Sequence, residues 1–292
     1  MSLTTEEITI VSGQALPTPP KKETPAVLSG FVDFWQGLKR HELWLNLAWE
    51  DLVQSFYRTK LGLLWVPLAF LLRVSIFVVI FRQLVDSESA DRVVLYITVG
   101  FLIWEVLITG LTDGLSLFTS NGNWIQASSM PFSIFSFQQT TTNLFRFSLH
   151  AVVVAGALYL FRNGISDQFD LTDVALMAVA FIAIVVNITW VQIFFGIVCA
   201  RFRDVQHLIG SLIRVLFFLT PVIWRPVQIG DFADLIHQLN PFTHYIEIVR
   251  TPLLDGHFPT TSWIVVGVFT VVGHLSAWIL LGLTKKKVAF WI

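Results

Sequence analysis

The stretch VALMAVAFIAIVVNITWVQIFFGIVCA, residues 174–200, contains no Asp, Glu, Lys or Arg, and the charged sequence RFRD, residues 201–204, follows it directly. About 20 apolar residues are enough to carry an α-helix across the roughly 30 Å hydrocarbon core of a bilayer. We therefore expect residues 174–200 to form a membrane-spanning helix. The RFRD sequence then forms a short charged turn at the membrane boundary, before the next apolar stretch begins.

The composition of the whole chain indicates the same class of protein. Of its 292 residues, 54% are hydrophobic and only 13% are charged, whereas soluble domains carry about 25% charged residues. The formal net charge of −1 gives no general attraction to nucleic acid, so no nucleic-acid partner is expected. A single cysteine, Cys199, excludes a disulfide framework. The sequence has no Gly-rich phosphate-binding loop, so this chain is not expected to hydrolyse nucleotides itself.

Apolar stretches of similar length recur along the chain and predict an all-α integral membrane protein with six transmembrane helices. The fifth predicted span is the shortest, and it contains both Arg214 and Pro221. The predicted spans are Leu61–Val85, Val93–Leu111, Phe145–Phe161, Val174–Ala200, Leu208–Ile223 and Trp263–Leu283.

The distribution of lysine and arginine predicts the orientation of these spans. With six spans both termini lie on one side, and the side richer in Lys and Arg faces the cytoplasm. Eleven of the 19 Lys and Arg residues fall on the side of the termini and five on the opposite side, so both termini are expected to be cytoplasmic. The stretch 112–143 is then a second cytoplasmic connection, with short helices around Pro131. The long outer segment, 224–262, contains two short amphipathic pieces, 232–239 and 242–254, and is expected to be re-entrant.

The first 60 residues divide into two parts. Residues 1–30, which contain four prolines, predict a flexible cytoplasmic tail, with a docking peptide as the alternative. Residues 31–60 predict one amphipathic helix that lies in the membrane interface, with packing against a soluble partner as the competing interpretation. Its apolar face carries Leu45, Ala48, Trp49, Leu52 and Phe56.

Four charged residues lie within or at the edge of predicted spans, namely Arg73, Glu105, Arg146 and Arg214. A charge at the centre of a membrane helix costs about 2.5–3.5 kcal/mol or more, so each is expected to face protein or water. A polar path or intramembrane ion pairs would satisfy them. For Arg73 and Arg146, local pairing or snorkelling is the alternative.

No catalytic constellation is recognisable in the sequence. His237 and His244 lie seven residues apart, but no Cys or carboxylate completes a metal-binding set around them. This chain is therefore not expected to be an enzyme or to bind a metal.

Four short motifs occur in a characteristic order: YRTKLGLLW at 57–65, FRD at 202–204, FLTPVIW at 218–224 and NPF at 240–242. Together they resemble the membrane subunit of ABC-2 type polysaccharide exporters, which move O-antigen, capsule or teichoic acid polymers. The resemblance covers about residues 31–290 and assigns residues 61–292 to a six-span transmembrane domain.

The resemblance implies a homodimer in the bacterial cytoplasmic (inner) membrane, with a separate ABC ATPase at its cytoplasmic face. ATP and Mg²⁺ would bind to that ATPase, so no cofactor is expected on this chain. The implied substrate is a glycan linked through diphosphate to a polyprenol lipid. The helix within residues 31–60 corresponds to the gate helix of the family.

The resemblance also implies roles for individual residues. Arg58 is expected to contact the lipid diphosphate, because a guanidinium matches phosphate geometry. The residues expected to couple to the ATPase are Trp49, Asp51, Asn123, Trp124, Pro131, Arg201, Arg203 and Asp204. The aromatic residues expected to line the channel are Phe70, Phe77, Phe217, Phe218 and Trp224.

Three alternatives remain open at this point. An ABC-2 permease for a drug or lipid would share the architecture. A secondary transporter or channel would use no ATPase, but such proteins often show internal repeats, and no convincing repeat relates the two halves of this chain. A membrane glycosyltransferase would need an acidic cluster at the interface, and the densest acidic group, Asp86, Glu88 and Asp91, is better explained as a solvated loop.

Overall fold

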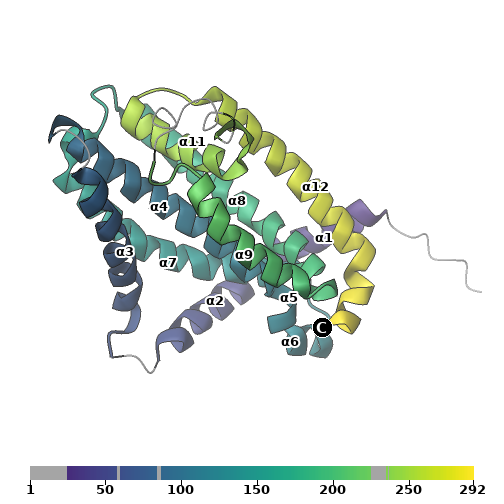
Figure 1. Cartoon of the computed structure of the whole chain (residues 1–292). Helices are drawn as coiled ribbons and strands as arrows, with labels where there is room; N and C mark the ends of the chain where they lie inside the picture. The colour runs from purple at the N-terminus through teal and green to yellow at the C-terminus, as the bar shows by residue number, and fades with distance from the viewer. Residues whose placement is uncertain (1–24, 58–59, 84–86, 225–234, 236) are drawn as a thin grey trace, which may run out of the picture.

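The computed structural model describes residues 25–57, 60–83, 87–224, 235 and 237–292, and every regular element in these ranges is helical (Figure 1). The bundle has two ends: one carries α2, α5, α6 and the C-terminus, and the other carries α11 (Figure 1). In chain order the elements are α1 (Ala26–Lys39), α2 (His41–Phe56), η1 (Gly62–Leu64), α3 (Trp65–Arg82), α4 (Ser87–Leu115), α5 (Leu117–Ser120), α6 (Gly122–Ala127), α7 (Ser133–Leu160), η2 (Arg162–Gly164), α8 (Leu171–Arg201), α9 (Asp204–Leu219), α11 (Pro241–Asp255) and α12 (Thr260–Trp291).

Among the described residues, five helical segments are long and apolar enough to cross a membrane, and they match the predicted spans one to four and six. The all-α membrane fold is therefore confirmed. The segments are Gly62–Arg82, Ala90–Leu115, Ser133–Leu160, Leu171–Arg201 and Thr260–Trp291.

The predicted fifth span is shorter than expected. It corresponds to α9, whose 16 residues measure about 24 Å at 1.5 Å per residue. The helix ends because Thr220, which precedes Pro221, adopts an extended conformation with φ −92° and ψ 133°. Residues 208–223 are thus not one regular helix, and a total of six spans stays a prediction.

The third span begins earlier than its hydropathy indicates. The sequence prediction started it at Phe145, whereas α7 starts at Ser133. The additional turns carry polar residues that are buried against neighbouring helices: the Ser136 hydroxyl, for example, donates a hydrogen bond to Gln192 Oε1 at 2.9 Å. Tertiary packing therefore extends the helix through a stretch that apolar periodicity alone excludes. The short helices α5 and α6 occupy what remains of the connection.

The N-terminal region forms two helices rather than the single helix predicted for residues 31–60. Helix α1 begins at Ala26, inside the stretch predicted as a tail, and ends at Lys39. Arg40, with φ −88° and ψ 46°, is not helical and separates α1 from α2. Helix α1 packs along α12, whereas α2 packs along α7. The contact between α1 and α12 needs glycine, because a Cβ atom on Gly30 would overlap the backbone carbonyl of Trp278. The other predicted tail residues, 1–24, lie outside the described residues.

A buried carboxylate joins α1, α7 and α12. The side chain of Asp33 is fully buried and accepts hydrogen bonds from the backbone N–H groups of Phe132, at 3.2 Å, and Ser133, at 3.0 Å. Lys285 of α12 contacts the same carboxylate through Nζ at 2.5 Å. Since the first N–H groups of a helix have no partner inside that helix, Asp33 of α1 caps α7 from outside.

We expect Asp33→Ala to lower the free energy of unfolding by on the order of 3 kcal/mol, because it removes the cap of α7 and leaves Lys285 unpaired. The melting temperature of the purified chain in detergent should fall by several degrees. Glu50→Ala, an exposed carboxylate on α2, is the matched control and should melt with the wild type. Equal melting of the Asp33 variant and this control would show that the buried carboxylate does not hold the three helices together.

Candidate functional site

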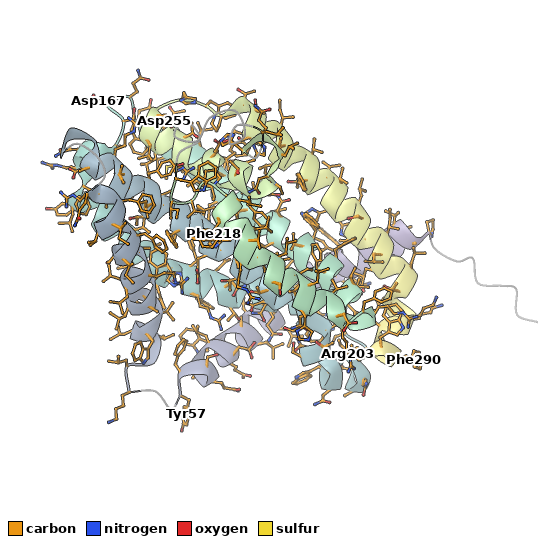
Figure 2. All side chains as sticks on the ribbon, viewed as in Figure 1. Tyr57, Asp167, Arg203, Phe218, Asp255 and Phe290 are labelled. Carbon is orange, nitrogen blue, oxygen red and sulfur yellow. The ribbon has the colours of Figure 1, made fainter. Side chains whose placement is uncertain are left out.

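Helices α3 and α9 expose large apolar side chains over much of their length. No residue of α9 is buried. Figure 2 shows Phe218 on α9, between the two ends of the bundle. Lipid or a second protein chain therefore covers these helices in the membrane. The exposed apolar residues include Leu68, Leu71, Leu72, Ile76, Val79 and Ile80 on α3, and Leu208, Leu212, Val215, Phe218 and Leu219 on α9.

A cavity of about 240 Å³ lies between α3, α4 and α7, and we refer to it as the polar cavity. It is partly open to the outside and combines charged and polar side chains with an apolar wall. Arg73 lies near the middle of α3 and Arg146 near the middle of α7, so the cavity lies at membrane depth. Its lining residues are Val66, Ala69, Phe70, Arg73, Glu105, Val106, Thr109, Asn143, Arg146, Phe147 and His150.

Two ion pairs balance the charges in and around the polar cavity. Arg73 of α3 donates to Glu105 of α4 at 2.5 Å. Arg146 of α7 lies 3.8 Å from Asp113 of α4, which also accepts a hydrogen bond from Gln139 at 2.8 Å. Three of the four charges expected at membrane depth therefore meet around one cavity. In this environment each charge has a partner, which lowers the free-energy cost of placing it there.

Arg214, the fourth of these charges, has a different environment. It is exposed on α9, and within the described chain its guanidinium donates a hydrogen bond to Ser211 at 3.2 Å. Because α9 lies at the surface, the positive charge of Arg214 faces outward from the subunit rather than into the polar cavity.

The aromatic residues expected to line a channel are largely packed inside the subunit. Phe70 is 1% exposed and stacks on His150 with 4.7 Å between ring centroids, so within the subunit it forms part of the wall of the polar cavity, and a channel-lining role for it stays a prediction. Phe77 and Phe217 pack on Phe101, with centroids 5.1 and 5.5 Å away. They tie α3 and α9 to α4. Phe218, by contrast, is 68% exposed.

The predicted coupling residues on α2 and α6 have mixed environments. Trp49 is half exposed, and its ring contacts that of Phe145 edge-on at 5.8 Å. Asp51 accepts a hydrogen bond from Gln138 of α7 at 2.5 Å, so it has a structural partner within the chain. Asn123 and Trp124 are exposed on α6, whereas Pro131 is buried.

The RFRD turn lies at the end of the bundle that carries the C-terminus. Figure 2 shows Arg203 at this end with Tyr57 and Phe290, opposite Asp167 and Asp255. Arg201 places its guanidinium 5.3 Å from the ring centroid of Trp291 on α12, which anchors the end of α8. Arg203 and Asp204 are exposed, and Asp204 is the first residue of α9. Arg58, the expected diphosphate contact, lies outside the described residues.

At the opposite end of the bundle, the motifs FLTPVIW and NPF contact each other. Asn240 caps α11 by accepting a hydrogen bond from the Phe242 N–H, and its amide donates to Thr220 Oγ1 at 2.8 Å. Arg250 is buried, donates to the Pro221 carbonyl at 2.9 Å and lies 3.7 Å above the ring of Tyr96. These interactions hold the turn where α9 ends.

Two residues at the α11 end have roles that the sequence did not predict. Arg250 is one of the five Lys and Arg residues counted on the side opposite the termini, and its side chain holds the turn after α9. Glu247 of α11 bonds to His237 and accepts a hydrogen bond from Ser262 of α12 at 2.6 Å. Burial alone would raise the pKa of Glu247, but these hydrogen bonds and the charges of His237 and Arg250 bring that pKa below its ordinary value. Periodicity carries no signal for either role.

The part of the chain that the structure describes contains no group of three or more His, Cys, Asp or Glu side chains placed to hold a metal ion. Chemically, the arrangement offers polar groups at membrane depth and apolar helices that lipid or another chain covers. Both features suit the movement of a polar molecule along the protein better than a reaction at a fixed site.

We expect Glu105→Gln to lower the free energy of unfolding by about 1 kcal/mol, because it leaves Arg73 without a carboxylate and the pair is partly exposed. The melting temperature in detergent should fall by about 2–4 °C. Exchanging the two charges, in the double variant Arg73→Glu with Glu105→Arg, should recover most of this loss. The single variants Arg73→Glu and Glu105→Arg are measured beside it. If the double variant loses as much stability as these two single variants together, the two side chains do not form a stabilising pair.

Comparison with known proteins gives a consistent result. The family model of the ABC-2 type transporter matches residues 42–254, from α2 to the end of α11. The O-antigen export system permease protein RfbA of Myxococcus xanthus is 26% identical over 230 residues, which cover 74% of this chain and 82% of the relative. Two proteins of the same name from Klebsiella pneumoniae are 23% and 22% identical, covering 71% and 77% of this chain and 78% and 86% of the relatives.

The family match includes the polar cavity, the RFRD turn and the two motifs that meet at the α11 end. It covers well over half of the chain, and the helical architecture agrees with it. This multi-pass membrane protein belongs to the ABC-2 type transporter family.

Proposed function

We propose that this chain is the membrane subunit of an ATP-driven exporter that moves a polyprenyl-diphosphate-linked polysaccharide of O-antigen type across the bacterial cytoplasmic membrane. The observation that carries the proposal is the combination of a polar cavity at membrane depth with uncovered apolar helices α3 and α9. Similarity to three permeases named for O-antigen export supports the choice of substrate.

A homodimer accounts for the uncovered surfaces. Charges at membrane depth have to face protein or water, and the Arg73 side chain is 46% exposed within one subunit. If α3 and α9 of two copies face each other, their apolar residues are covered and the partly exposed charges border a path between the subunits. Such a path would let a polar chain cross while its lipid anchor stays in the bilayer.

A separate ABC ATPase supplies the energy in this proposal. The end of the bundle with α2, α6 and the RFRD turn is the side that the positive-inside rule places in the cytoplasm. It exposes Trp49, Trp124 and Asp204 for contact with a protein partner. Helix α9 starts directly at the RFRD turn, so a push on this turn would be transmitted along α9 to the path.

Deletion of this chain from its own cells should cause long lipid-linked glycan to accumulate inside, while the surface glycan is lost. The measurement is extraction of polyprenyl-diphosphate-linked glycans from the deletion strain, the parent and a strain complemented with the intact chain. An unchanged surface glycan without internal accumulation would reject glycan export and favour an ABC-2 permease for a drug or lipid.

Asp204→Ala should leave membrane insertion intact but reduce export per ATP hydrolysed by about tenfold, which corresponds to a coupling free energy within the usual 1–3 kcal/mol. Export and ATP hydrolysis are measured together in vesicles that contain the chain and its ATPase. Asp204→Asn checks the loss of charge with less change in shape. Asp167→Ala, an exposed residue at the opposite end, is the control and should behave like the wild type. Normal coupling in both Asp204 variants would contradict a lever role for the RFRD turn.

A further inference from the structure

The polar cavity contains a buried side chain whose hydrogen-bonding capacity is not satisfied. Asn143 of α7 is 7% exposed, and its side-chain oxygen Oδ1 has no hydrogen-bond donor among the residues that the structure describes. The other end of its amide lies beside the Asp113 carboxylate. An ionised carboxylate accepts hydrogen bonds and donates none. Asp113 can therefore pair with Nδ2 of Asn143 but not with Oδ1, which still lacks a donor. Leaving a buried polar atom unpaired costs about 1–3 kcal/mol, which favours a ligand or water that donates to it.

The charges around the polar cavity indicate which ligand fits. Both arginines already have carboxylate partners: Glu105, which lines the cavity, at 2.5 Å from Arg73, and Asp113, outside the lining, at 3.8 Å from Arg146. Neither arginine is therefore an unpaired cation for a phosphate. The carboxylates are likewise balanced, which argues against a cation. A neutral ligand with hydroxyl groups can donate to Asn143 Oδ1 and to the Glu105 carboxylate, and it can accept from the arginines. A sugar ring has this chemistry.

The rest of the lining is consistent with a sugar. Val66, Ala69 and Val106 contribute apolar surface, which can contact the C–H groups of a pyranose ring. The volume of about 240 Å³ exceeds that of a single water molecule, which is about 30 Å³, several-fold. The cavity is also partly open, so a residue of a passing polymer can enter it from the side.

We propose that the polar cavity is a sugar-binding subsite, in which Asn143, Arg73 and Glu105 hydrogen-bond to hydroxyl groups of one residue of the transported glycan. This inference rests on the proposed function. It assigns to the paired charges a role in contacting the neutral part of the substrate, whereas the lipid diphosphate binds elsewhere. The subsite also makes the wall of the path selective for the arrangement of hydroxyl groups on a sugar.

A cysteine at Thr109, which lines the cavity from α4, tests the proposal. The native Cys199 is buried and gives little background reaction. Membranes with the complete transporter are opened by freeze–thaw and treated with a charged methanethiosulfonate reagent. Two probes are compared: oligosaccharides released by mild acid from the cells' own surface glycan, and inorganic diphosphate. At about ten times its dissociation constant, the oligosaccharide should slow the labelling of Thr109→Cys about tenfold. Diphosphate should have no effect.

Two control variants separate a cavity effect from a general one. Asp167→Cys lies in the loop between η2 and α8, outside the membrane-spanning helices, and is exposed. It does not line the cavity, so its labelling rate should not respond to either probe. Asn143→Val, combined with Thr109→Cys, removes the side-chain amide at similar size and should abolish protection by the oligosaccharide while labelling itself continues.

Three results would overturn the proposal. Protection by diphosphate instead of the oligosaccharide would identify an anion site. Labelling without protection by either probe would identify a hydrated cavity only, and absence of labelling would show that no soluble ligand reaches the cavity. The deletion experiment separates these results from a failure of the proposed function. If deletion of the chain abolishes the surface glycan but neither probe protects Thr109→Cys, the sugar-binding subsite is rejected and glycan export stands.

Discussion

The buried carboxylate of Asp33 sets the position of α7 relative to the rest of the bundle. It caps the first residues of α7 from α1 and pairs with Lys285 of α12, so one side chain fixes three helices that are far apart in sequence. Fixing the first residues of α7 determines how the helix is rotated about its own axis and how deep it lies in the membrane. Asn143 and Arg146 lie three to four turns further along the same helix, and their place in the polar cavity therefore depends on this distant contact.

The membrane imposes opposite requirements on the two sides of this subunit. Apolar residues on α3 and α9 are stable against lipid or another chain, whereas the charges between α3, α4 and α7 are stable only against protein or water. The aromatic cluster of Phe77, Phe101 and Phe217 links the two regions, since it ties both surface helices to α4. A movement of α9 would therefore reach α3 and the cavity through packed rings rather than through a flexible loop.

Much of the fold could be predicted because apolar length and helix identity are local properties of the sequence. The apolar stretches located five membrane-spanning helices, and the resemblance of four motifs led to the correct family. The site was less predictable. Ser133 begins a helix in a polar stretch because Asp33, 100 residues earlier, caps it. Neither the stacking of Phe70 on His150 nor the buried amide of Asn143 carries a sequence signal. Pairings of this kind depend on which helices meet, and periodicity does not encode this.

The contact between α1 and α12 has a consequence for the order in which the subunit assembles. Gly30 of α1 approaches the backbone at Trp278, and Gly282 of α12 approaches that of Ala26, so at these two points the helix backbones come into direct contact. Because α1 precedes every membrane-spanning helix and α12 follows the other four, the surface that receives α1 is synthesised only after those four spans. Until α12 is inserted, α1 has no docking site on it. Insertion of α12, rather than of the earlier spans, therefore closes this side of the subunit.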